Sequence, residues 1–160
     1  GIMHRDIKPD NILMSNELVC KISDFGVSKM IWESGSDLVH QSVGTPAFMS
    51  PELCHIGAVE SHGYSDDVWA LGITLYALLM GRLPFYRDDL FELYEAIQHD
   101  ELCLNDCRAS LACQDLLRSM LDKAEPNRIS VPDMFKHPWV TDHGRDPMPP
   151  LTLTDDKAID

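Results

Sequence analysis

The chain has 160 residues, which is enough for one hydrophobic core and one domain. Hydrophobic residues make up 44% and charged residues 24%, a composition typical of a globular protein rather than a disordered one. The formal net charge is -13, from 13 Lys and Arg against 26 Asp and Glu. This acidic balance argues against nucleic-acid binding, which needs clustered cations. It is compatible with a basic peptide substrate, although a well-solvated surface explains it without any partner.

The cysteines indicate reduced thiols rather than disulfides or a metal site. Their number is odd, and no Cys-x-x-Cys pair occurs. Cys103, Cys107 and Cys113 lie close together in the sequence, but their spacing matches no zinc signature, and His99 is the only imidazole near them. We therefore expect a cytoplasmic protein, with the nucleus as a second compartment. No apolar run approaches the ~20 residues of a membrane helix, so no membrane partner is expected.

The first predicted elements in chain order are a polar loop and a small β-hairpin. Residues 4–11 read His-Arg-Asp-Ile-Lys-Pro-Asp-Asn. Two short apolar runs, 12–14 and 19–22, follow, and the polar residues 15–18 join them in a pattern typical of a hairpin. Residues 24–52 keep no helical or strand period and are rich in Ser, Gly and Thr. Long loops of this kind in compact domains are usually functional.

Four helices are predicted in the second half of the chain. The first is opened by Ser65-Asp66, continues from Val68 to Met80 and is closed by Gly81; apolar residues lie almost all round it, which predicts a buried helix. The N-caps of the other three are Asp88-Asp89, Ser110, and Ser130 with Asp133 in a capping-box pattern. The side chains expected on the apolar sides of the second and third helices are Leu90, Phe91, Leu93, Tyr94, Ile97, Leu116, Leu117, Met120 and Leu121.

Four side chains in the two polar loops meet the requirements of phosphoryl transfer. Asp6 can accept the proton of a substrate hydroxyl and orient its oxygen, and Lys8, two residues on, can neutralise charge on the moving group. Asn11 and Asp24 offer hard oxygen ligands, suited to magnesium that bridges nucleotide phosphates. Phe25 is expected to bury its ring and so to set the direction of Asp24. ATP and Mg²⁺ are the predicted cofactors.

Each of these motifs is weak by itself. A lone Asp-Phe-Gly is usually an ordinary turn, and a lone His-Arg-Asp is similarly common. Found together, in this order and at short separation, they favour a functional site, because a conjunction of motifs is far more specific than either alone.

The two motifs, 4–11 and 24–26, resemble the catalytic and metal-binding loops of eukaryotic protein kinases. The resemblance covers residues 1 to about 143 and includes Gly44-Thr45-Pro46 and Ser50-Pro51-Glu52, where Ser50 replaces the usual Ala. It implies a mainly α fold: a kinase-like C-lobe with a small β-hairpin near the active site and no N-lobe. The implied parts are a partial kinase domain (1–141), its catalytic loop (4–11), activation segment (24–52) and helical subdomain (65–141), and an extended or disordered acidic tail (142–160).

The resemblance also assigns supporting roles. Asp67 corresponds to the aspartate that holds the catalytic-loop backbone, and Arg128 to the arginine that pairs with the glutamate ending the activation segment, here Glu52. Leu13 corresponds to the floor of the adenine pocket and Ser23 to its back. The implied nucleotide-binding set is Lys8, Asn11, Leu13, Ser23 and Asp24.

Lys8 also places the chain among the Ser/Thr kinases, which carry Lys two residues after the catalytic Asp. Thr45 resembles the threonine that bridges Asp6 and Lys8 in that group. Residues 24–28, 43–49 and 137–141 resemble the calcium/calmodulin-dependent protein kinase kinases and their fungal relatives. This resemblance implies a protein substrate, in particular the activation loop of a downstream kinase of the AMP-activated group. Calmodulin control has no support in this segment, whose acidic tail shows no basic amphipathic helix.

Arg5 precedes the catalytic Asp, as in kinases whose activation segment is ordered by phosphorylation. Ser34, Ser36, Ser42 and Thr45 are hydroxyls in that segment. Because Thr45 is expected to be occupied structurally, Ser42 is the preferred regulatory phosphorylation site.

No Gly-rich phosphate loop and no nucleotide-holding strand lysine occur in the sequence. We therefore expect the isolated chain to be a poor kinase and to be poorly folded, because the predicted helix 68–80 lacks part of its apolar cover. The alternative is a non-catalytic kinase-like interaction module. The intact set of polar residues favours the enzyme, since a scaffold has no physical need for them. A small-molecule phosphotransferase is disfavoured, because it has no use for a long peptide-docking segment.

Overall fold

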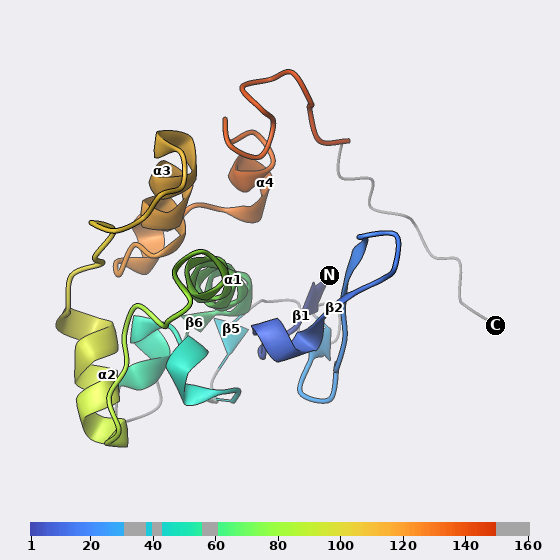
Figure 1. Ribbon diagram of the computed structural model, residues 1–160. Helices are drawn as coiled ribbons and strands as arrows, with labels where there is room; N and C mark the ends of the chain where they lie inside the picture. The colour runs from blue at the N-terminus through green and yellow to red at the C-terminus, as the bar shows by residue number, and fades with distance from the viewer. Residues whose placement is uncertain (31–37, 40–42, 56–60, 150–160) are drawn as a thin grey trace.

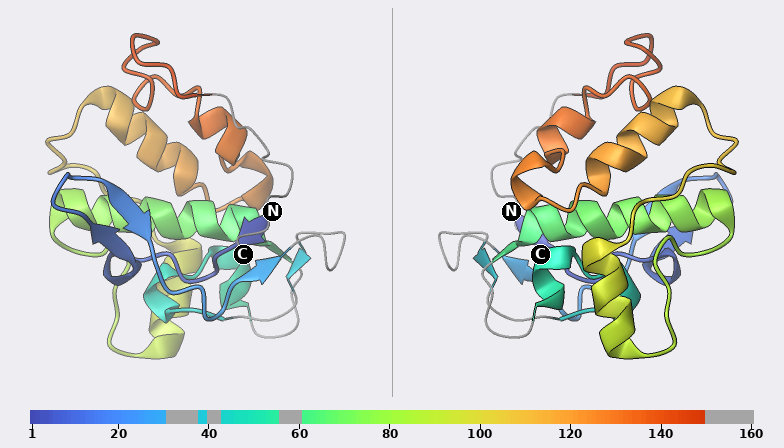
Figure 2. Two further views of the ribbon diagram at one scale, coloured as in Figure 1. Left: turned by 90° about the vertical axis from the view of Figure 1, so that its right-hand side faces the viewer. Right: turned by 90° about the vertical axis from the view of Figure 1, so that its left-hand side faces the viewer.

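The computed structural model describes residues 1–30, 38–39, 43–55 and 61–149. Within them, four α-helices are accompanied by short 3-10 helices and by three antiparallel sheets of two strands each. Helix α1 runs through the middle of the molecule, with α3 and α4 on one side and α2 and the short helices η2 and η3 on the other (Figures 1 and 2). The fold is therefore mixed rather than mainly α, which corrects the expectation from the sequence.

Helix α1 spans Gly63–Met80 and is the longest of the described helices. It begins two residues before the expected start and ends as predicted at Gly81, which has a left-handed φ of 66° and donates its N–H to the carbonyl of Ala77. Its middle is largely buried, as the all-round apolar pattern indicates, with Trp69, Ile73 and Tyr76 completely covered, but Leu78 and Leu79 near its end are exposed. The incomplete cover expected for this helix is thus found at its C-terminal end.

The N-caps predicted for the three shorter helices are confirmed. In α2 (Leu90–His99) the side chain of Asp89 accepts from two backbone N–H groups. In α3 (Leu111–Met120) Ser110 accepts from the N–H of Cys113, and in α4 (Val131–Met134) Ser130 accepts from the N–H of Asp133. These bonds satisfy N–H groups that have no partner inside the helix.

The apolar side of α3 is buried as predicted, whereas that of α2 is only partly so. Leu93 and Ile97 enter the core, but Leu90 and Phe91 face solvent. The reason is that α2 packs mainly against η3 (Pro51–Cys54), and one short neighbour cannot cover the whole arc of apolar positions.

The core has two parts that meet along α1. The larger one packs α1 against α2, η3 and the loop after α1, and the smaller one packs Val68 of α1 against α3. Gly72 lies where α1 packs against the end of α3, because a Cβ built there would come within 3.0 Å of the side chains of Leu121 and Met120. The close approach of the two helices therefore requires glycine at this point.

The predicted hairpin is confirmed as β2 (Ile12–Met14) paired with β3 (Cys20–Ile22). Two further pairs were not expected: β1 (Ile2–Met3) with β4 (Lys29–Met30), and β5 (Leu38–Val39) with β6 (Ser61–His62). The 3-10 helices η1 (Pro9–Asn11), η2 (Pro46–Phe48) and η4 (Glu125–Asn127) complete the described elements. The segment 24–52 thus contains short regular structure, although each element is too short to leave a period in the sequence.

The chain after α4 does not become extended at once. Residues 141–146 form hydrogen-bonded turns, in which His143 donates to the carbonyl of Pro138 and Asp146 to that of Thr141. Residues 142–146, the start of the predicted extended or disordered tail, are therefore turns, and residues 150–160 lie outside the described part of the chain.

Among the described helices, none has the length and apolar character required to cross a bilayer.

Candidate active site

Asp6, Lys8 and Thr45 form one hydrogen-bonded group, although Thr45 comes from a distant part of the chain. The Lys8 ammonium lies 2.8 Å from Asp6 Oδ2 and donates to Thr45 Oγ1 at 2.8 Å. The Thr45 hydroxyl and backbone N–H both donate to Asp6 Oδ1, at 2.8 and 3.0 Å. The bridging position predicted for Thr45 is therefore confirmed. Both oxygens of Asp6 are held in direction by this group.

The charges of this group are mutually stabilised. Burial acts to raise the pKa of Asp6, but the hydrogen bonds from Lys8 and Thr45 outweigh it and hold the pKa below its usual value. The hydrogen bond to Asp6 raises the pKa of Lys8, and the negative charges of Asp10 and Asp24 add to that effect. At neutral pH the site therefore presents an ionised carboxylate beside an ammonium group.

Asp67, in the first turns of α1, fixes the backbone of the catalytic loop. Its carboxylate accepts from the N–H of His4 at 2.7 Å and from the N–H of Arg5 at 2.8 Å, as predicted. Arg5 has a φ of 67°, a conformation that a side chain of this size rarely adopts. The two hydrogen bonds hold this strained residue in place, and its Nε donates to the carbonyl of Val27 at 2.6 Å.

Asn11 and Asp24 present oxygen atoms that suit magnesium. The Asn11 amide nitrogen donates to the carbonyl and to Oδ2 of Asp6, at 2.8 and 3.2 Å, which leaves its Oδ1 available. Asp24 is exposed, with a φ of 60°, and its Oδ1 accepts from the N–H of Gly26. Among the described residues no cluster of three or more His, Cys, Asp or Glu side chains could hold a metal by itself. This donor set fits an ion that also takes ligands from a nucleotide.

The residues predicted to line the nucleotide pocket lie on and beside the hairpin. Leu13 is exposed on β2, opposite Lys21 of β3. Ser23 follows β3, where its N–H and hydroxyl both donate to the carbonyl of Asn11, and its own carbonyl lies 2.9 Å from His4 Nε2. These contacts connect the end of the hairpin to the catalytic loop.

The expectation that Phe25 buries its ring is wrong, because the ring is 51% exposed. It meets the ring of the buried His4 edge to face, with centroids 4.9 Å apart. One covered edge is not enough to bury an aromatic ring. The direction of Asp24 is therefore not fixed by burial of Phe25 within the described residues.

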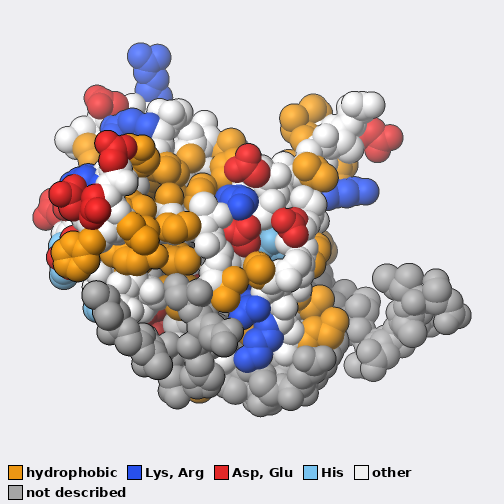
Figure 3. Space-filling model, turned by 90° about the horizontal axis from the view of Figure 1, so that it is seen from below, with side chains coloured by type: hydrophobic (Ala, Val, Ile, Leu, Met, Phe, Trp, Pro, Cys, Tyr) orange, Lys and Arg blue, Asp and Glu red, His pale blue; other side chains and the backbone are white. Residues whose placement is uncertain are grey.

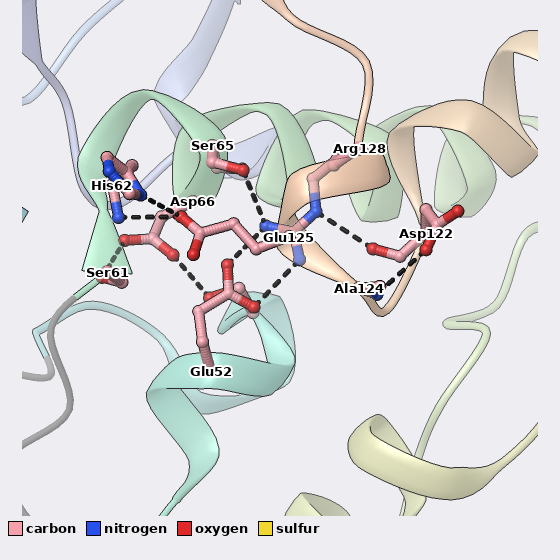
Figure 4. Close-up of polar contacts among 10 residues, drawn as sticks. Glu52, Ser61, His62, Ser65, Asp66, Asp122, Ala124, Glu125 and Arg128 are labelled. Atoms are coloured by element: carbon pink, nitrogen blue, oxygen red, sulfur yellow. Dashed lines mark hydrogen bonds and ion pairs between the residues drawn. The ribbon is translucent and has the colours of Figure 1, made fainter.

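Arg128 and Glu52 form the predicted ion pair beneath the site (Figure 4). Two nitrogens of the buried guanidinium meet the two carboxylate oxygens, at 2.5 and 2.9 Å. The same guanidinium donates to Ser65 on α1 and to the carbonyl of Asp122, and it lies 5.1 Å from the ring of Trp69. This one side chain therefore ties η3, α1 and the segment after α3 together.

Asp66 has a role that the sequence did not reveal. It was expected only to open α1, but its buried carboxylate accepts from the hydroxyls of Ser50 at 2.6 Å and Ser61 at 2.7 Å. Burial, aided by the nearby charge of Glu52, raises the pKa of Asp66 to about 7, against the effects of both hydroxyls and of Arg128. The hydroxyl that distinguishes Ser50 from the usual Ala is thus hydrogen-bonded to a buried acid.

A second unexpected contact ties the start of α1 to η4. Glu125 Oε1 accepts from the backbone N–H of His62 and lies 2.9 Å from its ring Nδ1 (Figure 4). These partners are 63 residues apart, so no local pattern could have indicated the pair.

Gly44 brings the activation segment against the catalytic loop. Its φ is 117°, and a Cβ there would lie 2.5 Å from the carbonyl oxygen of Arg5. The contact holds the following residue, Thr45, in reach of Asp6. Ser42, the preferred phosphorylation site, and the hydroxyls of Ser34 and Ser36 lie outside the described residues.

Comparison with known proteins agrees with this geometry. The family model of the protein kinase domain matches residues 1–140. The chain is 39% identical over 160 residues to calcium/calmodulin-dependent protein kinase kinase cmkC of Emericella nidulans, a match that covers 100% of this chain and 31% of that protein.

Two other relatives are serine/threonine-protein kinases. GRIK2 of Arabidopsis thaliana is 36% identical over 139 residues, covering 87% of this chain and 34% of that protein. The protein ssp1 of Schizosaccharomyces pombe is 38% identical over 167 aligned positions, covering 99% of this chain and 26% of that protein. The chain thus spans about a third or less of the length of these relatives. It belongs to the protein kinase domain family, whose members generally use ATP and Mg²⁺ to phosphorylate proteins, and its relatives are Ser/Thr kinases.

Proposed function

We propose that this chain is the C-lobe part of an ATP-dependent Ser/Thr protein kinase, which transfers a phosphoryl group from Mg-ATP to a protein hydroxyl. The observation that carries the proposal is the group formed by Asp6, Lys8 and Thr45, with Asp6 held through both oxygens. A carboxylate and an ammonium group fixed side by side are what positioning and charge neutralisation require in phosphoryl transfer.

In this proposal Asp6 accepts a hydrogen bond from the substrate hydroxyl and aims its oxygen at the phosphorus atom. Its lowered pKa makes it a weak base, so orientation is its main contribution and it takes up the proton late. Lys8, whose raised pKa keeps it protonated, neutralises charge that develops on the transferred group. Thr45, which bonds to both, holds Asp6 and Lys8 in fixed relative positions.

Asn11 Oδ1 and the exposed carboxylate of Asp24 would hold the magnesium ion in this proposal. When bound, the ion supplies positive charge to the nucleotide phosphates. Leu13 and Ser23 lie on the same hairpin and would contact the base of the nucleotide. The remaining phosphate contacts of a working enzyme would come from outside these 160 residues.

The names of the relatives narrow the proposed class of substrate. The name of the Emericella nidulans protein is that of a calcium/calmodulin-dependent protein kinase kinase. We propose the same type of reaction here, with the activation loop of a downstream kinase of the AMP-activated group as substrate. Cytoplasmic action, with access to the nucleus, fits such a substrate.

The second candidate function is a non-catalytic interaction module. One observation favours it: an apolar hollow of about 600 Å³ lies beside α1, with Ile2, Ile12, Leu71 and Met148 among its walls. A surface of this kind could bind a partner protein without any chemistry. The intact polar group around Asp6 has no use in such a module, which is why the enzyme is preferred.

The experiment is phosphoryl transfer by the complete protein that contains this chain, from γ-labelled ATP with magnesium to a protein substrate. The expected label is on Ser or Thr. Asp24→Asn should raise the magnesium concentration needed for half-maximal rate by about tenfold or more, since a metal ligand loses its charge. Asp10→Asn is the matched control, because Asp10 is also exposed and also acts on Lys8. No transfer, or equal magnesium dependence of the two variants, would contradict the proposal.

A further inference from the structure

The carboxylate of Asp66, in the first turn of α1, contacts two separate parts of the chain. One of its oxygens accepts from the Ser50 hydroxyl at 2.6 Å, and the other accepts from the Ser61 hydroxyl at 2.7 Å. Ser50 stands just before η3, at the end of the segment 24–52. Ser61 lies in β6 and is paired with Val39 of β5, which belongs to the same segment. One carboxylate therefore connects α1 to the middle and to the end of this segment.

All three side chains of this cluster are shielded from water. Asp66 is 8% exposed, and Ser50 and Ser61 are almost completely covered. Figure 3 shows, by contrast, Asp and Glu side chains at the surface of the molecule, where water solvates their charge. A buried polar group that loses its partner finds no water in its place, so these contacts hold their positions firmly. We call the three residues the Asp66 cluster.

Two carboxylates lie around the guanidinium of Arg128 (Figure 4). Arg128 is bonded to both oxygens of Glu52, and its positive charge also acts on Asp66. With both acids ionised, these three side chains carry one net negative charge, which is costly in a buried place. Burial, together with the charge of Glu52, raises the pKa of Asp66 to about 7. The Asp66 carboxyl therefore gains or loses its proton near neutral pH.

The strength of the two hydroxyl contacts depends on this proton. The hydroxyls of Ser50 and Ser61 both act to lower the pKa of Asp66, so they favour its ionised form. A hydrogen bond from a hydroxyl to a carboxylate is roughly twice as strong as one between neutral groups. A protonated carboxyl must instead donate to one of the hydroxyls, and both bonds are then between neutral groups. The cluster therefore binds the segment 24–52 most firmly when Asp66 is ionised.

A water-sized hollow joins the Asp66 cluster to the candidate active site. The hollow has a volume of about 20 Å³, and its walls include Asp66, Ser50, Thr45 and Asp6. The short helix η2 connects Thr45 to Ser50, and the N–H of Phe48 donates to the carbonyl of Thr45 at 2.9 Å. A shift of Ser50 is therefore passed through ordered backbone to Thr45, whose bonds hold Asp6.

We propose that Asp66 is a positioning residue for the reaction: through its two hydroxyl contacts it fixes the segment that carries Thr45. Because these contacts strengthen as Asp66 ionises, the rate of phosphoryl transfer rises with pH across the neutral range. Ser50 stands where Ala is usual in protein kinases, so the device depends on residues of this particular chain. The inference rests on the proposed kinase function, because it names a residue that sets the rate of that reaction.

The other titratable groups around the cluster are distinguishable from it. In β6, the ring of His62 lies 2.9 Å from Glu125 in a pair at the surface. Burial raises the pKa of Asp67, the next residue of α1, but its bonds go to the backbone of the catalytic loop. Asp6 and Lys8 stay ionised throughout, because the pKa of the first is lowered and that of the second is raised. A pH dependence that comes from the cluster must therefore respond to the loss of its hydroxyls.

The test measures kcat of the complete protein with a Ser-containing substrate peptide between about pH 6 and 8. In the parent protein kcat should rise by about threefold or more through pH 7. Asp66→Asn should keep kcat near the low-pH value over the whole range, since an amide does not ionise. Ser50→Ala should move the rise to higher pH, because the ionised form loses a donor. The KM for ATP should change by less than about twofold in both variants, since neither residue contacts the nucleotide-binding set.

Two matched controls separate the cluster from general effects. Thr74→Val removes another covered hydroxyl from α1, one that donates to the carbonyl of Ala70. Glu125→Gln changes the partner of His62 and leaves the cluster intact. Both should keep the pH midpoint of the parent, with all variants folded at the assay temperature. A midpoint that moves in Glu125→Gln and not in Ser50→Ala would overturn the inference, and so would identical pH profiles for the parent and Asp66→Asn.

Hydrogen exchange followed by mass spectrometry tests the same contacts without phosphoryl transfer. In Asp66→Asn at about pH 8, the amides of residues 43–55 should exchange about threefold faster or more than in the parent, while those of α3 should keep the parent rate. Unchanged exchange with normal transfer would reject the positioning role and leave the kinase function intact. Faster exchange in a protein that transfers no phosphate would instead reject the proposed function and keep the contact between Asp66 and the segment.

Discussion

The loops that carry the candidate catalytic residues and the helices beneath them are stabilised in different ways. In the loops, directional hydrogen bonds hold strained residues such as Arg5 and Asp24, and side chains such as Phe25 stay exposed. In the helices, large apolar side chains such as Trp69 and Ile73 are completely buried. The fold therefore depends on packing around α1, whereas the site depends on a few polar contacts. Among these, the hydrogen bonds of Asp67 connect the site to α1.

The largest expected effect comes from the buried ion pair between Arg128 and Glu52. Arg128→Met leaves Glu52 and Asp66 without their cation in a buried place, and the free energy of unfolding should fall by about 3–5 kcal/mol. Urea denaturation of the complete protein measures this. Arg145→Met is the control, because the Arg145 side chain is 79% exposed in its pair with Asp142 and should matter by less than about 0.5 kcal/mol. Similar losses of unfolding free energy in the two variants would show that the buried ion pair stabilises the fold no more than the exposed pair does.

Gly44→Ala should break the site while leaving the helices intact. A Cβ at Gly44 would clash with the carbonyl of Arg5 and push Thr45 from Asp6, so kcat should fall by about 10²-fold. Gly144→Ala is the matched control, since Gly144 also has a positive φ, 83°, but a Cβ there meets nothing within 4 Å. Both variants bear the backbone strain, and only the first should lose activity. If kcat stays at the parent value in Gly44→Ala, the close contact does not position Thr45.

Gly72→Ala should destabilise the helices and leave the catalytic loops intact. The added methyl group would crowd Leu121 and Met120, and overpacking of this kind costs about 1–3 kcal/mol of stability. The rate per folded molecule should stay close to the parent value, because the loops are held by other contacts. Leu78→Ala, at an exposed position on the same helix, is the control for a small change in apolar volume. A fall in kcat with unchanged stability would refute the division between the regions.

Counted per pH unit, the smallest expected effect is the pH dependence of stability that comes from Asp66. Its pKa is raised from 3.8 to about 7 by burial, so the folded state keeps a proton that the unfolded state releases. This contribution to stability is complete below about pH 4 and is lost as the pH rises toward 7, at most on the order of 1 kcal/mol per pH unit. Asp66→Asn should remove that slope. Parallel stability curves for the two proteins between pH 5 and about 7.5 would show that Asp66 is already ionised throughout.

Local patterns predicted the elements that local interactions form. The caps Asp89, Ser110 and Ser130, the helix end at Gly81 and the hairpin all lie where the residues indicated. These features depend on residues within a few positions of one another. The strand pairs β1–β4 and β5–β6 were missed, since each strand has only two residues and its partner is distant.

Contacts across the fold required either a resemblance or the structure. The Arg128–Glu52 ion pair joins residues that are 76 positions apart, and Asp67 accepts from His4 and Arg5, which are more than 60 positions away. Both contacts were predicted only because the chain resembles protein kinases. Asp66 with Ser50 and Ser61 has no sequence signal beyond a helix start. Phe25, Leu90 and Phe91 were expected to be buried because they are apolar, but burial depends on what lies opposite, which composition does not give.

The claim that the loops carry the chemistry and the helices the stability is tested most directly by Asp6→Asn in the complete protein. Its turnover and its melting temperature are measured together. Asp6 is held by loop contacts that the core does not need, so the melting temperature should stay within a few degrees while turnover falls by about 10²–10⁴-fold. That combination would assign the chemistry to the loops and the stability to the helices. Retained turnover in a folded Asp6→Asn protein would show that Asp6 does not orient the substrate hydroxyl. It would contradict the assignment of the chemistry to the loops.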